Sequence, residues 1–171
     1  ISDLEVEHED TTGKLYHVRY ELEPTDKSEI RNLKSEMDYI MVATTRPETI
    51  LGDTAVAVNP KDKRYKKLIG RIAILPALGR RIPIIGDDVV DMEFGTGAVK
   101  VTPGHDPTDY DIGQRHNLPI INMMNKDATV SEAGGAYAGM DRYDARKKLV
   151  GDLERDGLLD HIADHQMSIG R

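Results

Sequence analysis

Alternation of apolar and polar residues with a period of two runs through the first two thirds of the chain and constrains its fold most. The segments that show it are rich in Val, Ile and Tyr and are bounded by Gly, Pro or Asp: 14–22 (KLYHVRYEL), 37–45 (MDYIMVATT), 53–59 (DTAVAVN), 70–85 (GRIAILPALGRRIPII) and 97–102 (GAVKVT). This pattern predicts strands whose side chains point alternately to two faces. Short strands separated by Gly and Pro indicate a curved sheet or a barrel.

Two segments carry helix signals. Segment 140–162 (MDRYDARKKLVGDLERDGLLDHI) spaces its apolar residues as one face of a helix would, and Asp141 stands where an N-cap is expected. Segment 106–117 (DPTDYDIGQRHN) offers Asp106 as its N-cap. Many strands followed by a closing helix favour the α+β class over a regular alternation of strands and helices. We predict a β-barrel-rich single domain, residues 1–171, with a few peripheral helices.

The charge balance limits the kinds of partner. Thirty Asp and Glu residues against 23 Lys and Arg give a formal net charge of −7, which argues against a protein that coats nucleic acid non-specifically. A narrow contact with one nucleic-acid end remains compatible with this charge. Segment 61–67 (KDKRYKK) is the best candidate for such a contact, but a run of charges more often only solvates a surface.

The chain contains no Cys. Disulfides and thiolate metal sites are therefore excluded, and this composition fits the reducing cytoplasm. No apolar run is long enough to span a bilayer, so we expect a cytoplasmic protein with no membrane partner. Because the sequence starts with Ile1 rather than Met, we also expect a fragment of a longer protein.

The first candidate site lies in segment 93–113 (EFGTGAVKVTPGHDPTDYDIG). Lys100 and Thr102 are two residues apart on a predicted strand and therefore share one face. A sharp turn then leads into the predicted helix, whose start carries Asp106 and Asp109. Side chains and unpaired backbone N–H groups converge at such a rim. Carboxylates at a helix start are also what any stable helix favours, so this spacing alone favours a helix cap slightly over a site.

The second candidate site lies in segment 41–60 (MVATTRPETILGDTAVAVNP). Behind a predicted strand, hydroxyl groups and a guanidinium stand on a turn that proline stiffens, and the residues are Thr44, Thr45, Arg46 and Thr49. The structural alternative is a capping pair between Thr45 and Glu48. Taken singly, this segment indicates only a Thr-rich strand end.

Taken together, the two stretches strongly resemble the signature segments of the editing domain that is inserted in class I aminoacyl-tRNA synthetases. The matching stretches are ATTRPETILGDTAVAVNP (43–60) and GTGAVKVTPGHDPTDYDIGQRH (95–116). Lys100, followed by HDPTD, makes the chain most similar to the valyl-tRNA synthetase family. The likeness extends over nearly the whole chain, because three further segments resemble the first hairpin, the last helix and the final stretch of that domain: 2–22, 140–159 and 165–171.

The resemblance implies a fold and a domain organisation. The fold would be the barrel-rich one of class I synthetase editing domains. Residues 1–171 would form an editing domain cut from a larger synthetase. Since an inserted domain leaves and rejoins its parent at one place, Ile1 and Arg171 should lie on the same side of the fold.

The resemblance also implies an activity. Water would hydrolyse the ester that joins a mischarged threonine to tRNA(Val), with threonyl adenylate as a further substrate. A hydrophobic pocket that accepts valine cannot strongly reject a near-isostere that adds a hydroxyl. A second, polar pocket can refuse valine, because the valine methyl would leave polar groups unpaired at roughly 1 to 3 kcal/mol each. The implied partners are the 3′ acceptor end of tRNA(Val), the mischarged threonine and the rest of the parent synthetase, with no cofactor or metal.

Roles follow for residues that match the motifs of the family. Lys100, Thr102 and Asp109 are expected to bind the threonine hydroxyl. Asp106 and Asp109 are expected to receive the α-ammonium group, and the sequence does not decide between these two carboxylates. The resemblance further implies a substrate-binding group around the terminal adenosine and the ester, which comprises Thr44, Thr45, Arg46, Thr49, Phe94 and His105. Water held by Asp and Thr side chains is the expected nucleophile, and His105 as general base is an alternative.

Three other functions remain open from the residues. The domain could belong to the isoleucyl-type relative and act on valyl-tRNA(Ile), or it could hold a tRNA acceptor end without cleaving anything. A third, unrelated class is a metal-dependent hydrolase built on His105, Asp106, Asp109 and His116. Ester hydrolysis separates the first two, and metal analysis tests the third.

Overall fold

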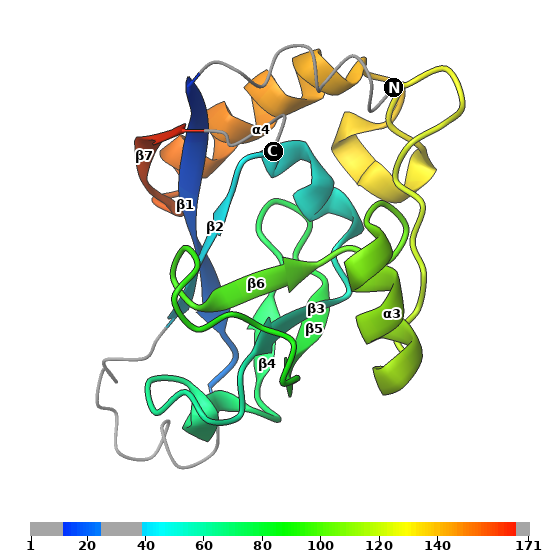
Figure 1. The fold of residues 1–171 in the computed structure, drawn as a ribbon. Coiled ribbons are helices and arrows are strands. Elements are labelled where there is room, and N and C mark those ends of the chain that lie inside the picture. Colours follow the sequence, from blue (N-terminus) through cyan, green and yellow to red (C-terminus); the bar gives the residue numbers. More distant parts are fainter. Residues whose placement is uncertain (1–11, 25–38, 167–171) are drawn as a thin grey trace.

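The computed structural model describes residues 12–24 and 39–166 (Figure 1). These residues form seven strands: β1 Thr12–Leu22, β2 Tyr39–Thr44, β3 Ala55–Val58, β4 Ile72–Ile74, β5 Arg81–Gly86, β6 Ala98–Val101 and β7 Leu159–Gln166. Each strand predicted from alternation is present, and segment 70–85 divides into β4 and β5. The α+β class is confirmed.

Helices cover the outside of the sheet. The described α-helices are α3, Pro107–His116, and α4, Arg142–Arg155. Short 3₁₀ helices form at η1 Pro47–Gly52, η2 Lys66–Leu68 and η3 Glu132–Tyr137. None of the helices in the described ranges is both long and apolar enough to cross a bilayer.

The strands make a mixed sheet that nearly closes on itself. Their order is β2-β1-β4-β5-β3-β6, with β7 added to β1, and β3 and β5 are parallel while the other pairs are antiparallel. The two edges, β2 and β6, pack against each other, and the Thr96 hydroxyl donates a hydrogen bond of 2.6 Å to the Met41 carbonyl oxygen across them. The result is the barrel that the short, punctuated strands predicted.

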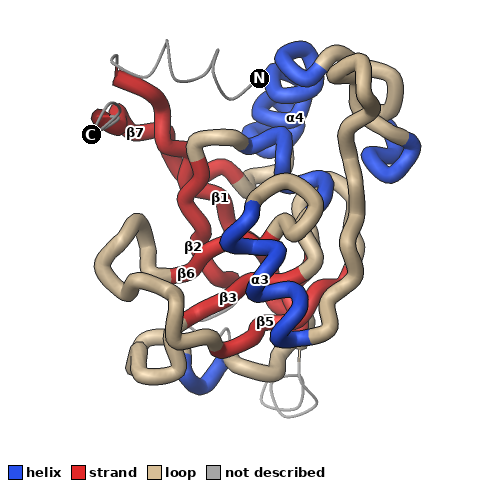
Figure 2. The backbone as a smooth tube through the Cα atoms, turned by 45° about the vertical axis from the view of Figure 1, so that its right-hand side comes forward, coloured by secondary structure: helices blue, strands red, loops and turns tan. Residues whose placement is uncertain are grey.

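Strand β3 separates two apolar regions, because its sequence AVAV is buried on both faces. Val56 and Val58 belong to the large cluster inside the barrel. Ala55 and Ala57 belong to a smaller cluster with Ile112 of α3. Small side chains on the outer face let α3 lie close over β3 and β5, as Figure 2 shows.

The last helix is shorter than the sequence predicted. Asp141 caps α4 by accepting a hydrogen bond from the Tyr143 backbone N–H, as expected, but α4 ends at Arg155. Gly157 adopts a φ of 76°, a left-handed conformation that glycine tolerates best, and the chain turns into β7. The prediction that the helix continues through Leu158 and Leu159 was therefore wrong.

Strand β7 pairs with β1 along its length, with Thr12 opposite Gln166. The outer ends of the described chain are thus neighbours in one sheet. Ile1 and Arg171 themselves lie outside the described residues.

Segment 61–67 forms turns that lead into η2. Asp62 and Tyr65 are buried, whereas the Lys and Arg side chains of the segment are exposed. The interpretation as a solvated face is supported, although the segment is not a regular helix.

Candidate active site

A pocket of about 240 Å³ opens between β2, η1, β6 and the start of α3. All ten residues proposed from the sequence line it: Thr44, Thr45, Arg46, Thr49, Phe94, Lys100, Thr102, His105, Asp106 and Asp109. Apolar walls from Leu15, Ala43 and Val99 complete it. Two segments that are at least 45 residues apart in the sequence, from Thr49 to Phe94, therefore meet at one concave surface.

The turn between β6 and α3 positions the carboxylates that line the pocket. The His105 backbone N–H bonds to the Thr102 carbonyl oxygen at 2.9 Å, and a Cβ on Gly104 would lie 2.6 Å from the Ile121 carbonyl oxygen, so only glycine fits there. Asp106 then caps α3, its carboxylate accepting from the backbone N–H groups of Thr108 and Asp109 at 2.8 and 3.1 Å. The helix-cap interpretation of Asp106 is confirmed, and the same residue still faces the pocket.

Lys100 lies at the floor of the pocket with 10% of its side chain exposed. Its Nζ donates to the hydroxyl oxygens of Thr49, at 2.7 Å, and Thr102, at 2.6 Å. A carboxylate oxygen of Asp53 lies 2.8 Å away. These contacts account for the three N–H donors of an ammonium group, and the shared face predicted for Lys100 and Thr102 is confirmed.

Asp53 is the part of this network that the sequence analysis missed. It is completely buried and accepts hydrogen bonds from the Thr102 hydroxyl at 2.7 Å and from the Tyr20 hydroxyl at 2.6 Å. Burial raises the pKa of Asp53, and the Lys100 ammonium opposes that shift. The available signal was a lone acid placed directly before the apolar run TAVAV, since an unpaired carboxylate is rarely buried.

Asp109 combines a structural contact with partial burial. One of its oxygens accepts a hydrogen bond of 2.9 Å from the Thr102 backbone N–H. The pKa of Asp109 is raised to about 6, mainly by burial and also by the negative charge of neighbouring Asp106. The hydrogen bond from Thr102 acts in the opposite direction and lowers the pKa. A carboxyl group with such a pKa gains or loses its proton near neutral pH.

The segment after β2 is held by its own side chains. The Thr44 hydroxyl accepts from the Arg46 backbone N–H at 3.0 Å, and the Thr49 hydroxyl donates to the Arg46 carbonyl oxygen at 2.8 Å. The alternative capping pair does not form, because the N-cap of η1 is Arg46 without a side-chain cap. Glu48 instead makes a bidentate ion pair with Arg146 of α4, at 2.7 and 3.0 Å.

The histidines do not form the alternative metal centre. His105 Nε2 accepts from the Met123 backbone N–H at 3.2 Å, and burial, followed by nearby Arg46 and Lys100, lowers its pKa. His116, at the other end of α3, lies 3.0 Å from Asp87. In the ranges 12–24 and 39–166 no group of three or more His, Asp or Glu side chains is placed to hold a metal ion.

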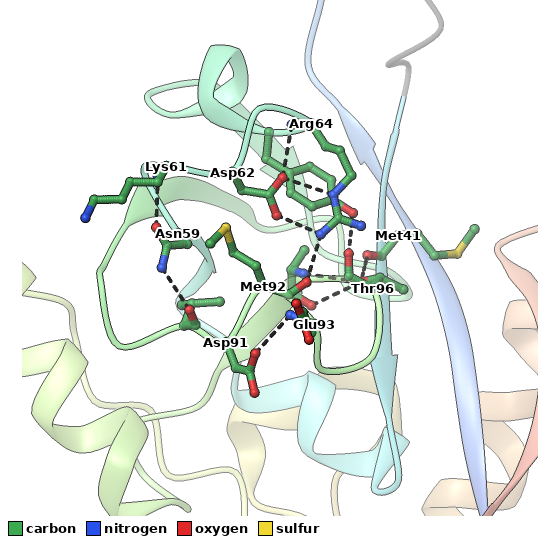
Figure 3. Close-up of polar contacts among 12 residues, drawn as sticks. Met41, Asn59, Lys61, Asp62, Arg64, Asp91, Met92, Glu93 and Thr96 are labelled. Atoms are coloured by element: carbon green, nitrogen blue, oxygen red, sulfur yellow. Dashed lines mark hydrogen bonds and ion pairs between the residues drawn. The ribbon is translucent and has the colours of Figure 1, made fainter.

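Phe94 lines the pocket and is 51% exposed. The loop that carries it is held in place by hydrogen bonds to residues of segment 62–65. Figure 3 shows the contacts: the Arg64 guanidinium pairs with Asp62 and donates to the Met92 carbonyl oxygen at 2.9 Å. The Tyr65 hydroxyl donates to the Thr96 carbonyl oxygen at 2.6 Å. The loop is therefore held in place on both sides of Phe94.

Comparisons with known proteins agree with this geometry. The profile of the family described as "Leucyl-tRNA synthetase, editing domain" matches residues 68–149. Two solved structures share the fold at a TM-score of 0.63: GlLeuRS-CP1 (13% identity, 91% of this chain and 100% of that one), and the LeuRS of an Agrobacterium radiobacter K84 ternary complex with tRNA and LeuAMS (22% identity, 92% and 20%).

Sequence relatives are closer. Valine–tRNA ligases of Thermotoga maritima and Bacillus subtilis are each 54% identical over 170 residues, and that of Clostridium acetobutylicum is 52% identical over 170 residues. In each case the alignment covers 99% of this chain and 18% of the relative. The chain thus spans less than a fifth of the length of these relatives.

The barrel, the pocket and these likenesses define an editing domain of the class I aminoacyl-tRNA synthetase type. Within that class, the chain belongs to the valyl-tRNA synthetase family.

Proposed function

We propose that this domain hydrolyses the ester bond of threonyl-tRNA(Val) and the mixed anhydride bond of threonyl adenylate, and so proofreads for the synthetase of which it is a part. The observation that carries the proposal is the small pocket whose floor is a closed polar network, Lys100 with Thr49, Thr102 and buried Asp53. The cytoplasm is the compartment that this role implies.

Selection of threonine would come from the two hydroxyl groups of the floor. Lys100 has its three donors engaged, so its role is to hold Thr49 and Thr102 in place rather than to offer a free N–H. Each of these hydroxyls donates one bond and accepts one, which leaves one lone pair on each oxygen. A substrate hydroxyl can donate to that lone pair. A valine methyl would cover it without making a hydrogen bond, at about 1 to 3 kcal/mol.

The carboxylates at the start of α3 would bind the α-ammonium group. Asp106 is exposed at the rim and Asp109 is half-buried deeper in the pocket. A cation between two carboxylates forms charge-assisted hydrogen bonds and would offset the cost of keeping Asp109 ionised. The geometry thus supports both carboxylates facing the amino acid.

The opposite rim would receive the terminal adenosine. Thr44, Thr45 and Arg46 of the turn after β2 line the pocket together with Phe94 of the fixed loop. An exposed aromatic ring in such a place suits stacking on a base. The guanidinium of Arg46 suits a ribose hydroxyl or the ester carbonyl oxygen.

Water is the nucleophile in this proposal. With its pKa near 6, the Asp109 carboxyl is ionised at neutral pH and is a base of suitable strength for orienting or deprotonating a water molecule. His105 is the weaker base candidate, because its Nε2 already accepts from the Met123 backbone N–H, and the Nδ1 of a neutral ring then carries the proton. Positioning and polarisation of ester and water supply the remaining barrier lowering.

The test is hydrolysis by this chain of tRNA(Val) charged with threonine, valine or isoleucine. We expect release of threonine only, with intact tRNA recovered. A domain that binds the acceptor end but releases nothing would be the non-catalytic module. Valyl-tRNA(Ile) is assayed beside them, and its preferential hydrolysis would indicate the isoleucyl-type function instead.

A further inference from the structure

Segment 61–67 reaches the loop that carries Phe94, although the segment itself lies outside the pocket. It alternates exposed basic residues with two buried side chains, Asp62 and Tyr65. The whole segment is described, and none of its residues lines the pocket. The proposed hydrolysis therefore makes no direct use of it. Two of its side chains nevertheless donate hydrogen bonds to the loop 87–97, which joins β5 to β6.

Arg64 is the side chain that joins the segment to this loop before Phe94. Its Nε and Nη2 donate to the two carboxylate oxygens of Asp62 at 3.0 and 2.7 Å, and its backbone N–H donates to the same carboxylate at 3.0 Å. Nη2 also donates to the Met92 carbonyl oxygen at 2.9 Å, as Figure 3 shows. Bidentate pairing fixes the plane of a guanidinium. Asp62 therefore orients Arg64, and Arg64 in turn holds Met92.

The loop is shaped around that guanidinium. Gly97 has a φ of 87°, and a Cβ at this position would collide with Nη2 of Arg64. The Gly97 backbone N–H donates to the Phe94 carbonyl oxygen at 2.9 Å, and the Phe94 N–H donates to the Asp91 carbonyl oxygen at 3.2 Å. Phe94 thus stands in hydrogen-bonded turns that meet Arg64 on both sides, at Met92 and at Gly97.

The Phe94 ring depends on such support. Half of it is exposed, so burial of the ring fixes the loop only in part. Ordering a loop and its side chains on binding lowers affinity. A ring that is held in advance therefore binds a base more tightly than a ring on a mobile loop.

We propose that Arg64 is a positioning residue for substrate binding, because it holds the loop 87–97 so that the Phe94 ring is in place to stack on the terminal adenosine. The inference rests on the proposed function for the identity of that ligand. Arg64 does not touch the substrate in this assignment, and its effect reaches the substrate only through Phe94. Loss of Arg64 should therefore weaken substrate binding and leave the hydrolytic step unchanged.

The position of the ring can be measured directly, because Phe94 is the only Phe in the chain. Incorporation of para-fluorophenylalanine then gives a single fluorine NMR resonance. In Arg64→Met we expect this resonance to move toward its position in the urea-unfolded protein. Arg81→Met is the matched control, since Arg81 makes a bidentate pair with Glu23 at 2.8 Å and is similarly exposed, 62% against 54% for Arg64. An unchanged resonance in Arg64→Met, or an equal change in Arg81→Met, would overturn the proposal.

Kinetics show whether the substrate depends on the position of the ring. For threonyl-tRNA(Val) we expect KM to rise about tenfold in Phe94→Ala and about fivefold in Arg64→Met, with kcat nearly unchanged in both. Because Arg64 acts through Phe94, the double variant should resemble Phe94→Ala alone. A KM raised about fiftyfold in the double variant, as two independent effects would give, contradicts the proposal. So does a loss of kcat in Arg64→Met.

A further variant separates positioning from stability. Arg64→Met leaves the Asp62 carboxylate, 4% exposed, without its bidentate partner, which destabilises the fold. Adding Asp62→Asn removes that buried charge, so the melting temperature should recover at least partly while KM stays raised. A KM that returns to the wild-type value together with the melting temperature would reduce Arg64 to a purely structural role.

Failure of this inference is distinguishable from failure of the proposed function. If the wild-type chain does not hydrolyse threonyl-tRNA(Val), the proposed function fails. The fluorine resonance needs no substrate, so it still decides whether Arg64 positions Phe94. An unchanged resonance in Arg64→Met then overturns the inference by itself.

Discussion

The Nζ of Lys100 lies 2.8 Å from Oδ1 of Asp53, a carboxylate that is completely buried beneath the pocket floor. The pair is almost removed from water, so each charge depends on the other. Thr49 and Thr102 are fixed through the same ammonium group. The shape of the substrate pocket therefore depends on a residue that does not line it.

Asp53→Asn should remove the counter-charge and leave the Lys100 ammonium buried without a partner. Breaking a buried ion pair in this way costs about 3 to 5 kcal/mol. We expect urea unfolding to show a loss of this order, together with slow deacylation of threonyl-tRNA.

The double variant Asp53→Asn with Lys100→Met is the control for this prediction. Because it removes both charges, its stability should recover at least partly relative to Asp53→Asn alone, while deacylation stays low. Strictly additive stability losses would show that the two side chains are not coupled.

Thr102→Val should be more harmful than its similar shape suggests. The Thr102 hydroxyl joins Lys100 and Asp53 in a buried position, so valine deprives each of them of one hydrogen bond, at about 1 to 3 kcal/mol. We expect a lower melting temperature and deacylation reduced about tenfold or more. Thr102→Ser keeps the hydroxyl, and a Ser variant as slow as the Val variant would remove the hydroxyl from the selection of threonine.

Asp109→Asn should stabilise the fold at neutral pH. Burial raises the pKa of Asp109 from the ordinary 3.8 to about 6, so above pH 6 the folded protein carries a buried charge that the unfolded chain keeps in water. Asn avoids that cost, on the order of 2 kcal/mol. The advantage should shrink as pH falls from 6 to 4, because the folded wild type then takes up a proton. Denaturant unfolding at pH 7.5 and 4.5 measures the difference in unfolding free energy between Asp109→Asn and wild type. An equal difference at the two pH values would refute the prediction.

The same carboxyl group should govern how deacylation depends on pH. Below about pH 6 Asp109 becomes protonated and can neither hold an ammonium group nor act on water. We expect the wild-type rate to fall tenfold per pH unit there, and Asp109→Asn to be slow by a hundredfold or more with a flat profile. Rates corrected for spontaneous ester hydrolysis decide this. A normal rate for Asp109→Asn would reduce the residue to a helix-start contact.

Arg146→Met should loosen the segment that carries Arg46 and Thr49. Glu48 has 3% of its side chain exposed and pairs with Arg146 at 2.7 Å, which ties η1 to α4. Loss of the partner should cost about 3 kcal/mol of unfolding free energy. If loss of the ion pair is the cause, the double variant Arg146→Met with Glu48→Gln should have nearly the same free energy of unfolding as Arg146→Met alone. Hydrogen exchange of the 46–52 backbone, faster in Arg146→Met than in wild type, would locate the effect.

Strands and helix starts were predictable because each rests on local rules. Alternation marked β1 to β6, and Asp106 and Asp141 cap their helices as their positions suggested. The pocket residues came from matched motifs rather than from spacing, since spacing alone favoured helix caps. Their convergence in one cavity needed the barrel, which brings β2 beside β6.

Other features depended on contacts between distant residues. The partners of Asp53 are Tyr20, 33 residues away, and Thr102, 49 residues away, so no local pattern shows that its charge is compensated. Strand β7 was missed because its sequence LDHIADHQ is mostly polar and follows a helix without an apolar run. Pairing with β1, and not local preference, makes it a strand.

The neighbouring positions of Thr12 and Gln166 have a mechanical consequence. Tension applied to both strands from that side would break the hydrogen bonds between β1 and β7 one after another from that end, rather than all at once. Strand β1 also supplies Leu15 to the pocket wall and Tyr20 to the buried carboxylate of Asp53. A force on the chain before Thr12 would therefore reach the pocket within a few residues, because β1 itself forms part of the pocket wall.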